Sequence, residues 1–179
     1  MKQQIGIIYS TVDGQTLKIC KELEKMLNNK LIKTALYSID DFSHNIIEFD
    51  TLIIGASIRY GKHRLSVKNF IVENKEILKK INTAFFSVNL VARKSEKDSA
   101  DTNPYLIKFM KKVKWSPDIL DVFAGKLDYN HYPFFDRIMI KLIMRMTHGP
   151  TKSDKAIEYT DWNRVKEFGE RICEIYKNT

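Results

Sequence analysis

The sequence predicts an α/β protein built on a parallel β-sheet with helices on both of its faces. Short apolar runs rich in β-branched residues recur along the chain, as at residues 5–9 and 51–54. Such runs are typical of parallel strands that are buried on both sides. Amphipathic segments, with apolar residues every three or four positions, separate the runs. Strands that alternate with helices favour a parallel sheet with right-handed crossovers.

The expected elements follow one another in five strand–helix units. Strands are predicted at residues 5–9, 31–39, 49–56, 83–88 and 119–124. The first helix has an apolar face made of Leu17, Cys20, Leu23 and Leu27. A single helix is expected after the third strand, with an inner face of Val67, Phe70, Ile71, Leu78 and Ile81. Another helix opens at Asn103-Pro104, and Thr160-Asp161 caps the last one.

Length and composition indicate one globular domain, residues 1–179, with 44% apolar and 29% charged residues. The net charge of +8 favours an anionic partner: nucleic acid, anionic lipid or an acidic small molecule. Cys20 and Cys173 have no metal-binding or redox spacing, so we expect them to be reduced in a cytoplasmic protein, and we expect no metal. No signal peptide and no apolar stretch long enough to span a membrane are recognised.

The turn between the first strand and helix has the composition of a phosphate site. It reads Tyr-Ser-Thr-Val-Asp-Gly-Gln-Thr over residues 9–16 and lacks both the Walker lysine and the glycine pattern of dinucleotide-binding folds. Backbone N–H groups, the helix N-terminus and neutral hydroxyls suit a phosphate monoester such as that of FMN. The alternative is an ordinary turn in which Thr16 caps the helix.

Two more loops are expected at the same edge of the sheet. Loops 10–16, 56–61 and 87–91 all follow strands, and the carboxyl ends of parallel strands meet at one edge, where ligands bind in such sheets. The second loop has flanking glycines that allow close approach to a flat ligand. This arrangement is the one that an FMN site requires.

An insertion at residues 126–155 separates the fifth strand from the last helix. After an aromatic stretch it contains a helix of about thirteen residues, roughly 20 Å long and too short to cross a bilayer. Arg137, Lys141 and Arg145 form a basic stripe on this helix, and almost all its other residues are apolar. A core helix with three cations at its margin is possible. We favour an interfacial helix or substrate lid, because the helix has more apolar residues than a single face packed on the core would need.

These segments together resemble a known family. Residues 11–16, 54–61, 86–94, 136–144 and 159–162 are similar to the corresponding segments of bacterial quinone-dependent protoporphyrinogen IX dehydrogenases, enzymes of haem biosynthesis with a flavodoxin-like fold. The resemblance runs nearly end to end and includes the insertion. It implies a five-stranded sheet in the order 2-1-3-4-5. It also implies FMN as cofactor, protoporphyrinogen IX as reductant and a membrane quinone as acceptor.

Site residues follow from the resemblance by position. The FMN phosphate would be held by Ser10, Thr11, Asp13, Gly14, Gln15 and Thr16, with Asp13 contributing its backbone rather than its carboxylate. The ribityl chain and ring would be lined by Ala56, Ser57, Ile58, Arg59, Tyr60, Gly61, Ser87, Val88, Asn89, Leu90 and Val91.

A few side chains are candidates for tuning and substrate contact. Arg59 near the flavin would favour its reduced form, unless it pairs with a surface carboxylate instead, and Tyr60 would stack on the ring or pack on the adjacent helix. Arg93, Lys94 and Arg137 are candidates for the porphyrinogen propionates, although plain solvation is favoured for each. His63 is expected to be solvated rather than catalytic.

The insertion predicts peripheral association with an anionic membrane surface at the inner membrane, through Arg137, Lys141 and Arg145. Alternatives are an electron-transfer flavodoxin, usually an acidic carrier, and a quinone reductase supplied by NAD(P)H. A nucleic-acid-binding protein is disfavoured, because the cations match no recognised motif. A homo-oligomer remains open.

Overall fold

The computed structural model describes residues 4–146 and 148–177. Five parallel strands form its centre in the order β2-β1-β3-β5-β6. Counted by these five strands alone, this is the predicted order 2-1-3-4-5. Their bounds are Ile5–Ser10 (β1), Thr34–Ser38 (β2), Thr51–Arg59 (β3), Asn82–Asn89 (β5) and Ile119–Ala124 (β6).

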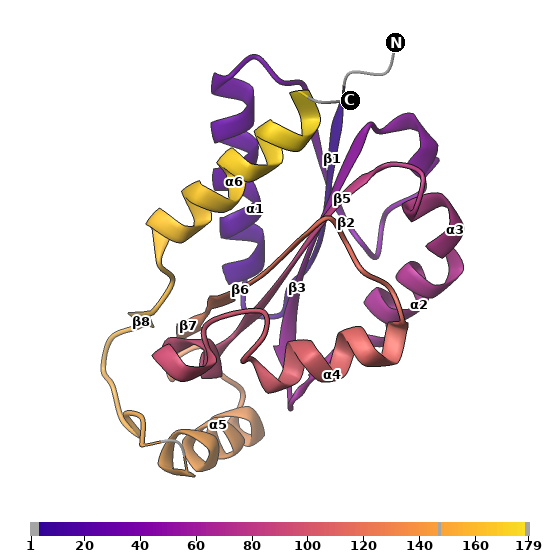
Figure 1. The fold of residues 1–179 in the computed structure, drawn as a ribbon. Helices are drawn as coiled ribbons and strands as arrows, with labels where there is room; N and C mark the ends of the chain where they lie inside the picture. The colour runs from indigo at the N-terminus through magenta and orange to yellow at the C-terminus, as the bar shows by residue number, and fades with distance from the viewer. Residues whose placement is uncertain (1–3, 147, 178–179) are drawn as a thin grey trace.

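Helices cover both faces of this sheet (Figure 1). One face is covered by α1 (Gln15–Asn29) and α6 (Trp162–Lys177), and the other by α2 (Leu65–Glu73), α3 (Lys75–Leu78) and α4 (Pro104–Val113). Short 3₁₀ turns at Ile46–Glu48 (η1), Leu90–Arg93 (η2) and Ser95–Lys97 (η3) complete this part of the chain. The central strands are therefore buried on both sides, as their apolar runs predict.

Each face has its own aromatic core. Below α1 and α6, the rings of Phe86, Phe123 and Phe168 contact one another at centroid distances of 5.4–5.6 Å. Gly55 on β3 makes room for this cluster, because a Cβ there would lie 2.3 Å from Cζ of Phe86. On the other face, Phe85 stacks on Phe109 of α4.

Several local expectations need correction. The helix expected after β3 is broken at Asn74, whose side-chain amide donates to the Phe70 carbonyl and ends α2. Thr16 does not cap α1, because the helix already begins at Gln15 after Gly14 (φ +81°). The strand β3 continues to Arg59 and then folds back as β4 (Lys62–His63), so that much of the expected second loop is strand.

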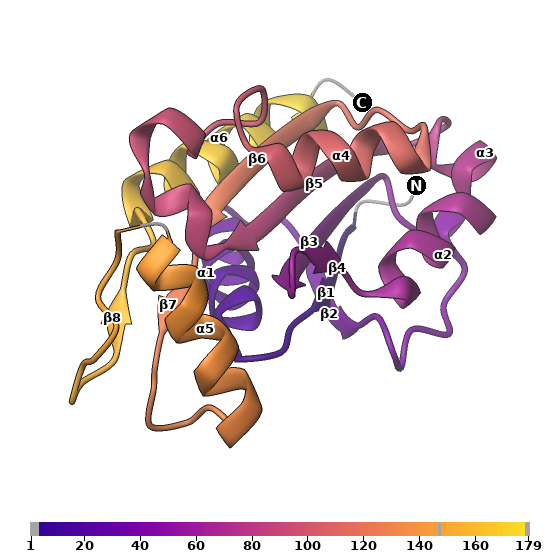
Figure 2. The same cartoon turned by 90° about the horizontal axis from the view of Figure 1, so that it is seen from below.

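The insertion packs against the carboxyl edge of the sheet, as Figures 1 and 2 show. It contains β7 (Lys126–Leu127) and α5 (Phe134–Met146), and β7 pairs antiparallel with β8 (Ile157–Glu158), which directly follows the insertion. Its small core is formed by Leu127, Tyr129, Tyr132, Ile140 and Met144. The predicted helix is confirmed, whereas the two-stranded ribbon at its base was not expected.

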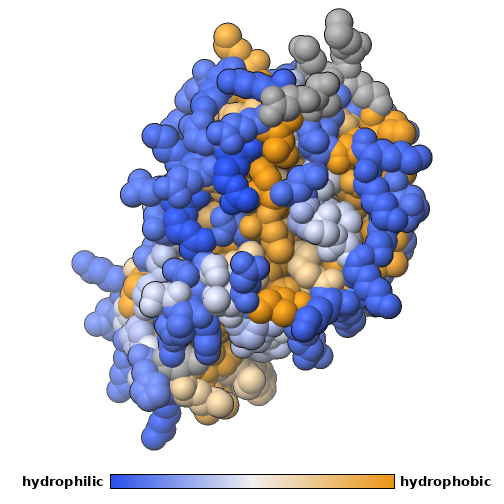
Figure 3. Space-filling model, in the orientation of Figure 1, coloured by the Kyte–Doolittle hydropathy of each residue, from blue (hydrophilic) through white to orange (hydrophobic). Residues whose placement is uncertain are grey.

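The outward face of α5 is apolar. Only Ile140 and Met144 of this helix are buried. Its exposed apolar side chains are Phe134, Phe135, Ile138, Met139, Leu142 and Met146. Figure 3 shows tan, apolar atoms at this end of the molecule. Within the part of the chain that is described, no helix is both long enough and apolar enough to cross a membrane.

Candidate functional site

A pocket opens at the carboxyl edge of the sheet, where the three predicted loops meet. The first loop contributes Thr11, Asp13, Gln15 and Thr16, and the third contributes Val88, Asn89, Leu90 and Val91. Between them lie Ser57, Ile58, Arg59, Tyr60 and Gly61. The structure thus brings together most of the residues that the sequence assigned to a cofactor.

Buried hydroxyl groups without partners mark the inner end of this site. The hydroxyls of Ser10, Thr16 and Ser57 are buried, and none accepts or donates a hydrogen bond within the described residues. Buried polar groups are almost always hydrogen-bonded, so three such hydroxyls near one helix N-terminus indicate a polar ligand. The N-terminus of α1 adds unpaired N–H groups and a partial positive charge. These residues fit the phosphate of FMN.

The first loop is held in shape by its own contacts. Gly14 has a left-handed conformation, and its N–H donates to Thr11 Oγ1 at 3.1 Å. Gln15 is buried and donates from Nε2 to Thr160 Oγ1 at 2.9 Å. Thr160 in turn donates to the Ala124 carbonyl at the end of β6. The first loop is therefore joined to the segment that leads out of the insertion.

Thr160 has a different role from the predicted one. Asp161, not Thr160, caps α6, because its Oδ1 accepts from the N–H groups of Asn163 and Arg164 at 2.9 and 3.3 Å. Thr160 instead supports Gln15. Thr160 is 145 residues from Gln15 in the sequence, so local sequence patterns could not reveal this contact.

Arg59 joins the first loop to the insertion. One terminal nitrogen donates to both carboxylate oxygens of Asp13 at 3.0 and 2.8 Å, and the other donates to Asp136 on α5. The Arg59 side chain is only 17% exposed. Burial disfavours its charge, but Asp13 and Asp136 outweigh that and raise the pKa of Arg59. The guanidinium therefore stays charged and pairs with carboxylates, and we call this arrangement the Arg59 clasp.

Aromatic rings surround the clasp. The guanidinium lies 5.6 Å from the ring centroids of both Tyr60 and Tyr132. Tyr60 has a left-handed backbone (φ 51°) and is half exposed at the pocket. The carboxylate of Asp13 accepts hydrogen bonds from Arg59, and the expectation that its backbone faces the phosphate stays a prediction. Flavin tuning by Arg59 and stacking by Tyr60 stay predictions.

Two of the predicted lining residues face elsewhere. Ala56 is buried in the core on the α2–α4 side of the sheet. Ser87 is buried, and its hydroxyl lies 2.9 Å from Nε2 of His63. Both lie on regular strand just before the chain reaches the carboxyl edge, whereas the residues that follow them, 57–61 and 88–91, line the pocket.

His63 is not solvated as expected. Its ring lies 4.2 Å from the ring of Phe109 and 5.8 Å from that of Phe85, and it hydrogen-bonds with Ser87. Burial lowers the pKa of His63 to about 3, so the side chain is neutral. A β4 strand that turns His63 inward explains the difference from the sequence expectation.

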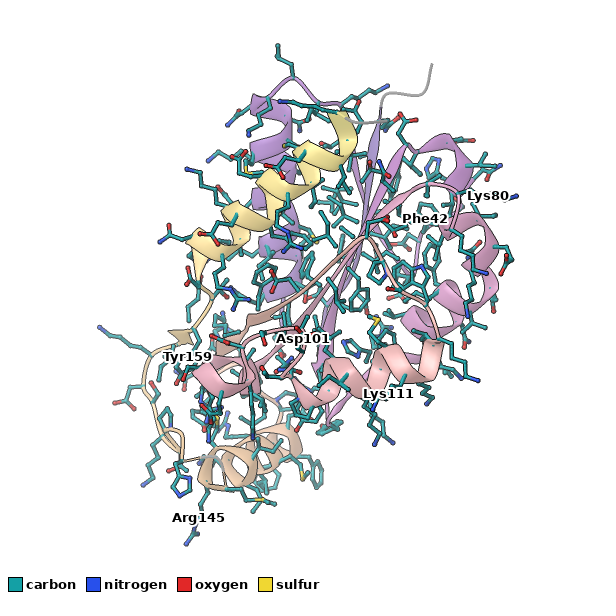
Figure 4. The ribbon with its side chains drawn as sticks, in the orientation of Figure 1. Phe42, Lys80, Asp101, Lys111, Arg145 and Tyr159 are labelled. Atoms are coloured by element: carbon teal, nitrogen blue, oxygen red, sulfur yellow. The ribbon has the colours of Figure 1, made fainter. Side chains whose placement is uncertain are left out.

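The predicted substrate and membrane cations do not form one group. Arg93 donates to the Leu90 carbonyl, Lys94 lies 3.9 Å from Glu96, and neither lines the pocket. Arg137 and Lys141 are half-buried beside Tyr132 and Tyr129, respectively. Arg145 is exposed and points away from the body of the protein in Figure 4.

Sequence reasoning missed a second wall of the pocket. It is formed by Tyr105, Gly125, Lys126, Tyr132, Ile140 and Ile143. Four of these residues belong to the insertion, whose aromatic and apolar composition was recognised but whose position was not. The helix α5 thus contributes directly to the site.

Comparisons with known proteins agree with this architecture. The model of the flavodoxin-domain family matches residues 6–154. An Escherichia coli K12 protein named protoporphyrinogen IX dehydrogenase (quinone) is 40% identical over 174 residues, which cover 94% of each chain. A Leishmania major protein of the same name is 40% identical over 164 residues, covering 90% of this chain and 71% of its own.

Solved structures show the same fold at low sequence identity. An archaeal flavodoxin has a TM-score of 0.55 at 13% identity, covering 97% of this chain and 99% of its own. Rubredoxin oxygen:oxidoreductase from Desulfovibrio gigas has a TM-score of 0.57 at 11% identity, covering 98% of this chain and 36% of its own. The predicted flavodoxin-like fold is confirmed.

We predict that Thr16→Val weakens FMN binding by roughly tenfold or more, since a hydroxyl bound to a charged group contributes about 1.5–3 kcal/mol. The free energy of unfolding without FMN should change little, because this hydroxyl has no partner to lose. Thr51→Val is the matched control. Its hydroxyl is also buried without a partner among the described residues, but Thr51 begins β3, at the end of the strand that is distant from the pocket. Quenching of FMN fluorescence measures both affinities, and equal affinities would contradict the assignment.

We predict that His63 makes the protein less stable as the pH falls below 6.5. Because its pKa falls from 6.5 to about 3 on folding, the unfolded chain binds a proton that the folded protein does not. The free energy of unfolding should therefore decrease by up to about 1.4 kcal/mol per pH unit below 6.5. Urea unfolding at pH 7.5 and 5.0 compares wild type with His63→Gln, which keeps a hydrogen-bonding group but does not titrate. Between pH 7.5 and 5.0, the free energy of unfolding should decrease by about 2 kcal/mol less in the variant than in the wild type. Equal decreases in the two proteins would refute the assignment.

Proposed function

The chain belongs to the protoporphyrinogen IX dehydrogenase (quinone) family, and we propose that it oxidises protoporphyrinogen IX to protoporphyrin IX with a quinone as electron acceptor. The protein is an oxidoreductase whose cofactor is FMN. The observation that carries the proposal is the pocket itself: unpaired buried hydroxyls mark a phosphate site at its inner end, and the insertion forms its outer wall.

FMN supplies two-electron redox chemistry when bound, so the six-electron conversion of porphyrinogen to porphyrin requires three turnovers. The chain contributes binding and positioning. Ser10, Thr16 and Ser57 have hydroxyls available for a phosphate and its attached chain, and Gly14 shapes the loop that presents them. A phosphate in this loop would be bound by these neutral donors and by the N-terminus of α1.

The outer part of the pocket suits flat, apolar molecules. Its walls include Ile58, Leu90, Ile140 and Ile143, together with the ring of Tyr105. Apolar walls exclude water from the space in which a ring system would lie. Arg59 also lies at the pocket, where its pairs with Asp13 and Asp136 hold the first loop and α5 in place around this space. This combination supports a lipophilic substrate pair better than a carrier that only exchanges electrons at its surface.

The insertion helix gives the site access to a membrane. We place α5 at the cytoplasmic surface of the inner membrane, with its exposed face in the lipid interface. Phe134 and Phe135 are 70% and 78% exposed, and Leu142 and Met146 continue the same apolar face. The far face of α5 contributes Ile140 and Ile143 to the pocket. A helix bound in this way would set the pocket beside the lipid that dissolves the quinone.

Turnover is the direct test of the function. The FMN-loaded protein is mixed with protoporphyrinogen IX without oxygen, with and without menadione, and porphyrin fluorescence is followed. We expect repeated turnover that depends on the quinone. No turnover, together with rapid FMN reduction by NAD(P)H, would reject the proposal in favour of an NAD(P)H-dependent quinone reductase.

Membrane association is tested by sedimentation with vesicles. We predict that Phe135→Asp/Leu142→Asp lowers vesicle binding more than tenfold, because each apolar side chain contributes about 1.5–3 kcal/mol when buried. The matched control Ile47→Asp/Val72→Asp removes two exposed apolar residues on other elements and should bind as wild type does.

Arg145→Glu should weaken binding only to vesicles that contain anionic lipid, because Arg145 is the exposed member of the predicted stripe. Equal binding by the wild type and the Phe135/Leu142 variant would refute the docking face.

A further inference from the structure

A second, cationic groove lies beside the pocket. It is formed where β4, α2 and α4 meet, and its volume is about 330 Å³. Figure 2 shows β4 between α4 and α2. Four lysines line this groove: Lys62 on β4, Lys68 on α2, and Lys108 and Lys112 on α4. No carboxylate lies among its described lining residues.

The four lysines have no counter-ions in the described structure. Other described surface lysines, Lys80 and Lys111 among them, also lack a carboxylate within 4 Å, so these four are distinguished by the fact that they line one groove. Lys108 and Lys112 are one helical turn apart, where like charges destabilise a helix by roughly 0.2–0.5 kcal/mol. Four cations around one groove with no carboxylate among its described lining residues produce a positive potential there, which favours an anionic ligand.

The floor of the groove is apolar and aromatic. Phe109 is buried at its base with its ring against His63, which is neutral and therefore adds no charge. Leu65 is exposed at its rim. A ligand here would contact rings and hydrocarbon at the floor and cations around it. That combination suits an extended apolar molecule with acidic substituents better than it suits a free inorganic anion.

The groove is continuous with the pocket of the cofactor. Gly61 and Tyr105 line both. A Cβ on Gly61 would lie only 3.2 Å from the Tyr105 ring, so these two residues form a narrow boundary between the two spaces. A flat molecule that reaches past them from the pocket would bring its edge among the lysines.

We propose that this lysine groove binds the two propionate carboxylates of the tetrapyrrole while its ring system reaches the pocket past Tyr105. The inference rests on the proposed function and names the part of the protein that recognises the substrate. It replaces the expectation that Arg93, Lys94 and Arg137 meet the propionates, because those side chains do not line either space. Four cations for two carboxylates give each acid group more than one donor.

Binding is measured on the FMN-loaded protein by the fluorescence anisotropy of protoporphyrin IX and of its dimethyl ester in the same detergent. The test variant is Lys108→Glu/Lys112→Glu. The control is Lys80→Glu/Lys111→Glu, which makes the same change in net charge at exposed lysines outside the groove. Lys80 and Lys111 are labelled in Figure 4.

The free acid should bind the test variant roughly tenfold more weakly than wild type or control, given up to about 1 kcal/mol for each exposed ion pair that is lost or reversed. The dimethyl ester should bind wild type, test variant and control alike. In turnover with menadione, the test variant should show a KM raised by a similar factor, with kcat within about twofold of wild type.

Three results would overturn the proposal: an ester that binds the wild type as tightly as the acid, equal losses in test and control variants, or no porphyrin binding by the wild type. A loss of NADPH affinity in the test variant, with porphyrin binding unchanged, would assign the groove to a nucleotide phosphate instead. Failure of the function itself is distinguishable, because the wild type would then show no quinone-dependent turnover. Wild-type turnover with an unchanged KM in the test variant rejects the groove alone.

Discussion

The parallel register of the central strands is the constraint on which the site depends. Ser10 lies beside Ala56 on β3, Ala56 beside Ser87 on β5, and Ser87 beside Val122 on β6. Because the strands run in one direction and end together, the loops after β1, β3 and β5 leave from the same edge. Burial of both sheet faces fixes this register, since a shift by one residue would turn every apolar side chain to the wrong side. The ligand site is therefore a consequence of the packing.

The Arg59 clasp couples this edge to the insertion. Arg59 is on the strand next to β1 and contacts Asp13 in the phosphate loop and Asp136 on α5. Loss of Arg59 would leave both carboxylates without their shared cation, so this one side chain positions the two segments relative to each other. Thr160, in the segment between β8 and α6, makes a second link to the first loop through Gln15. The insertion is thus a structural part of the pocket. One face of α5 lines the pocket, and its opposite, apolar face is exposed.

Two surfaces with different chemistry flank the pocket. The apolar face of α5 is suited to lipid, and the lysine groove between β4, α2 and α4 is suited to carboxylates. An amphipathic substrate, lipophilic in its ring and acidic at one edge, would meet both requirements at once. The net charge of +8 is accordingly not spread evenly over the surface: four of its lysines, without carboxylate partners, line one groove.

The sequence by itself determined the strands, the phosphate loop, the insertion helix and the strand order that the family resemblance implied. Local patterns carry this information: apolar runs for buried strands, hydroxyls and Gly14 before α1, and apolar spacing in the helices. Only the tertiary structure decided that Ala56 and Ser87 face away from the pocket, that His63 packs against Phe109 and Ser87, and that Tyr105 and Ile143 line the site. It also decided that Lys62, Lys68, Lys108 and Lys112 share one groove. These properties depend on contacts between residues far apart in the chain, and periodicity records which face of an element is apolar but not which distant segment it meets.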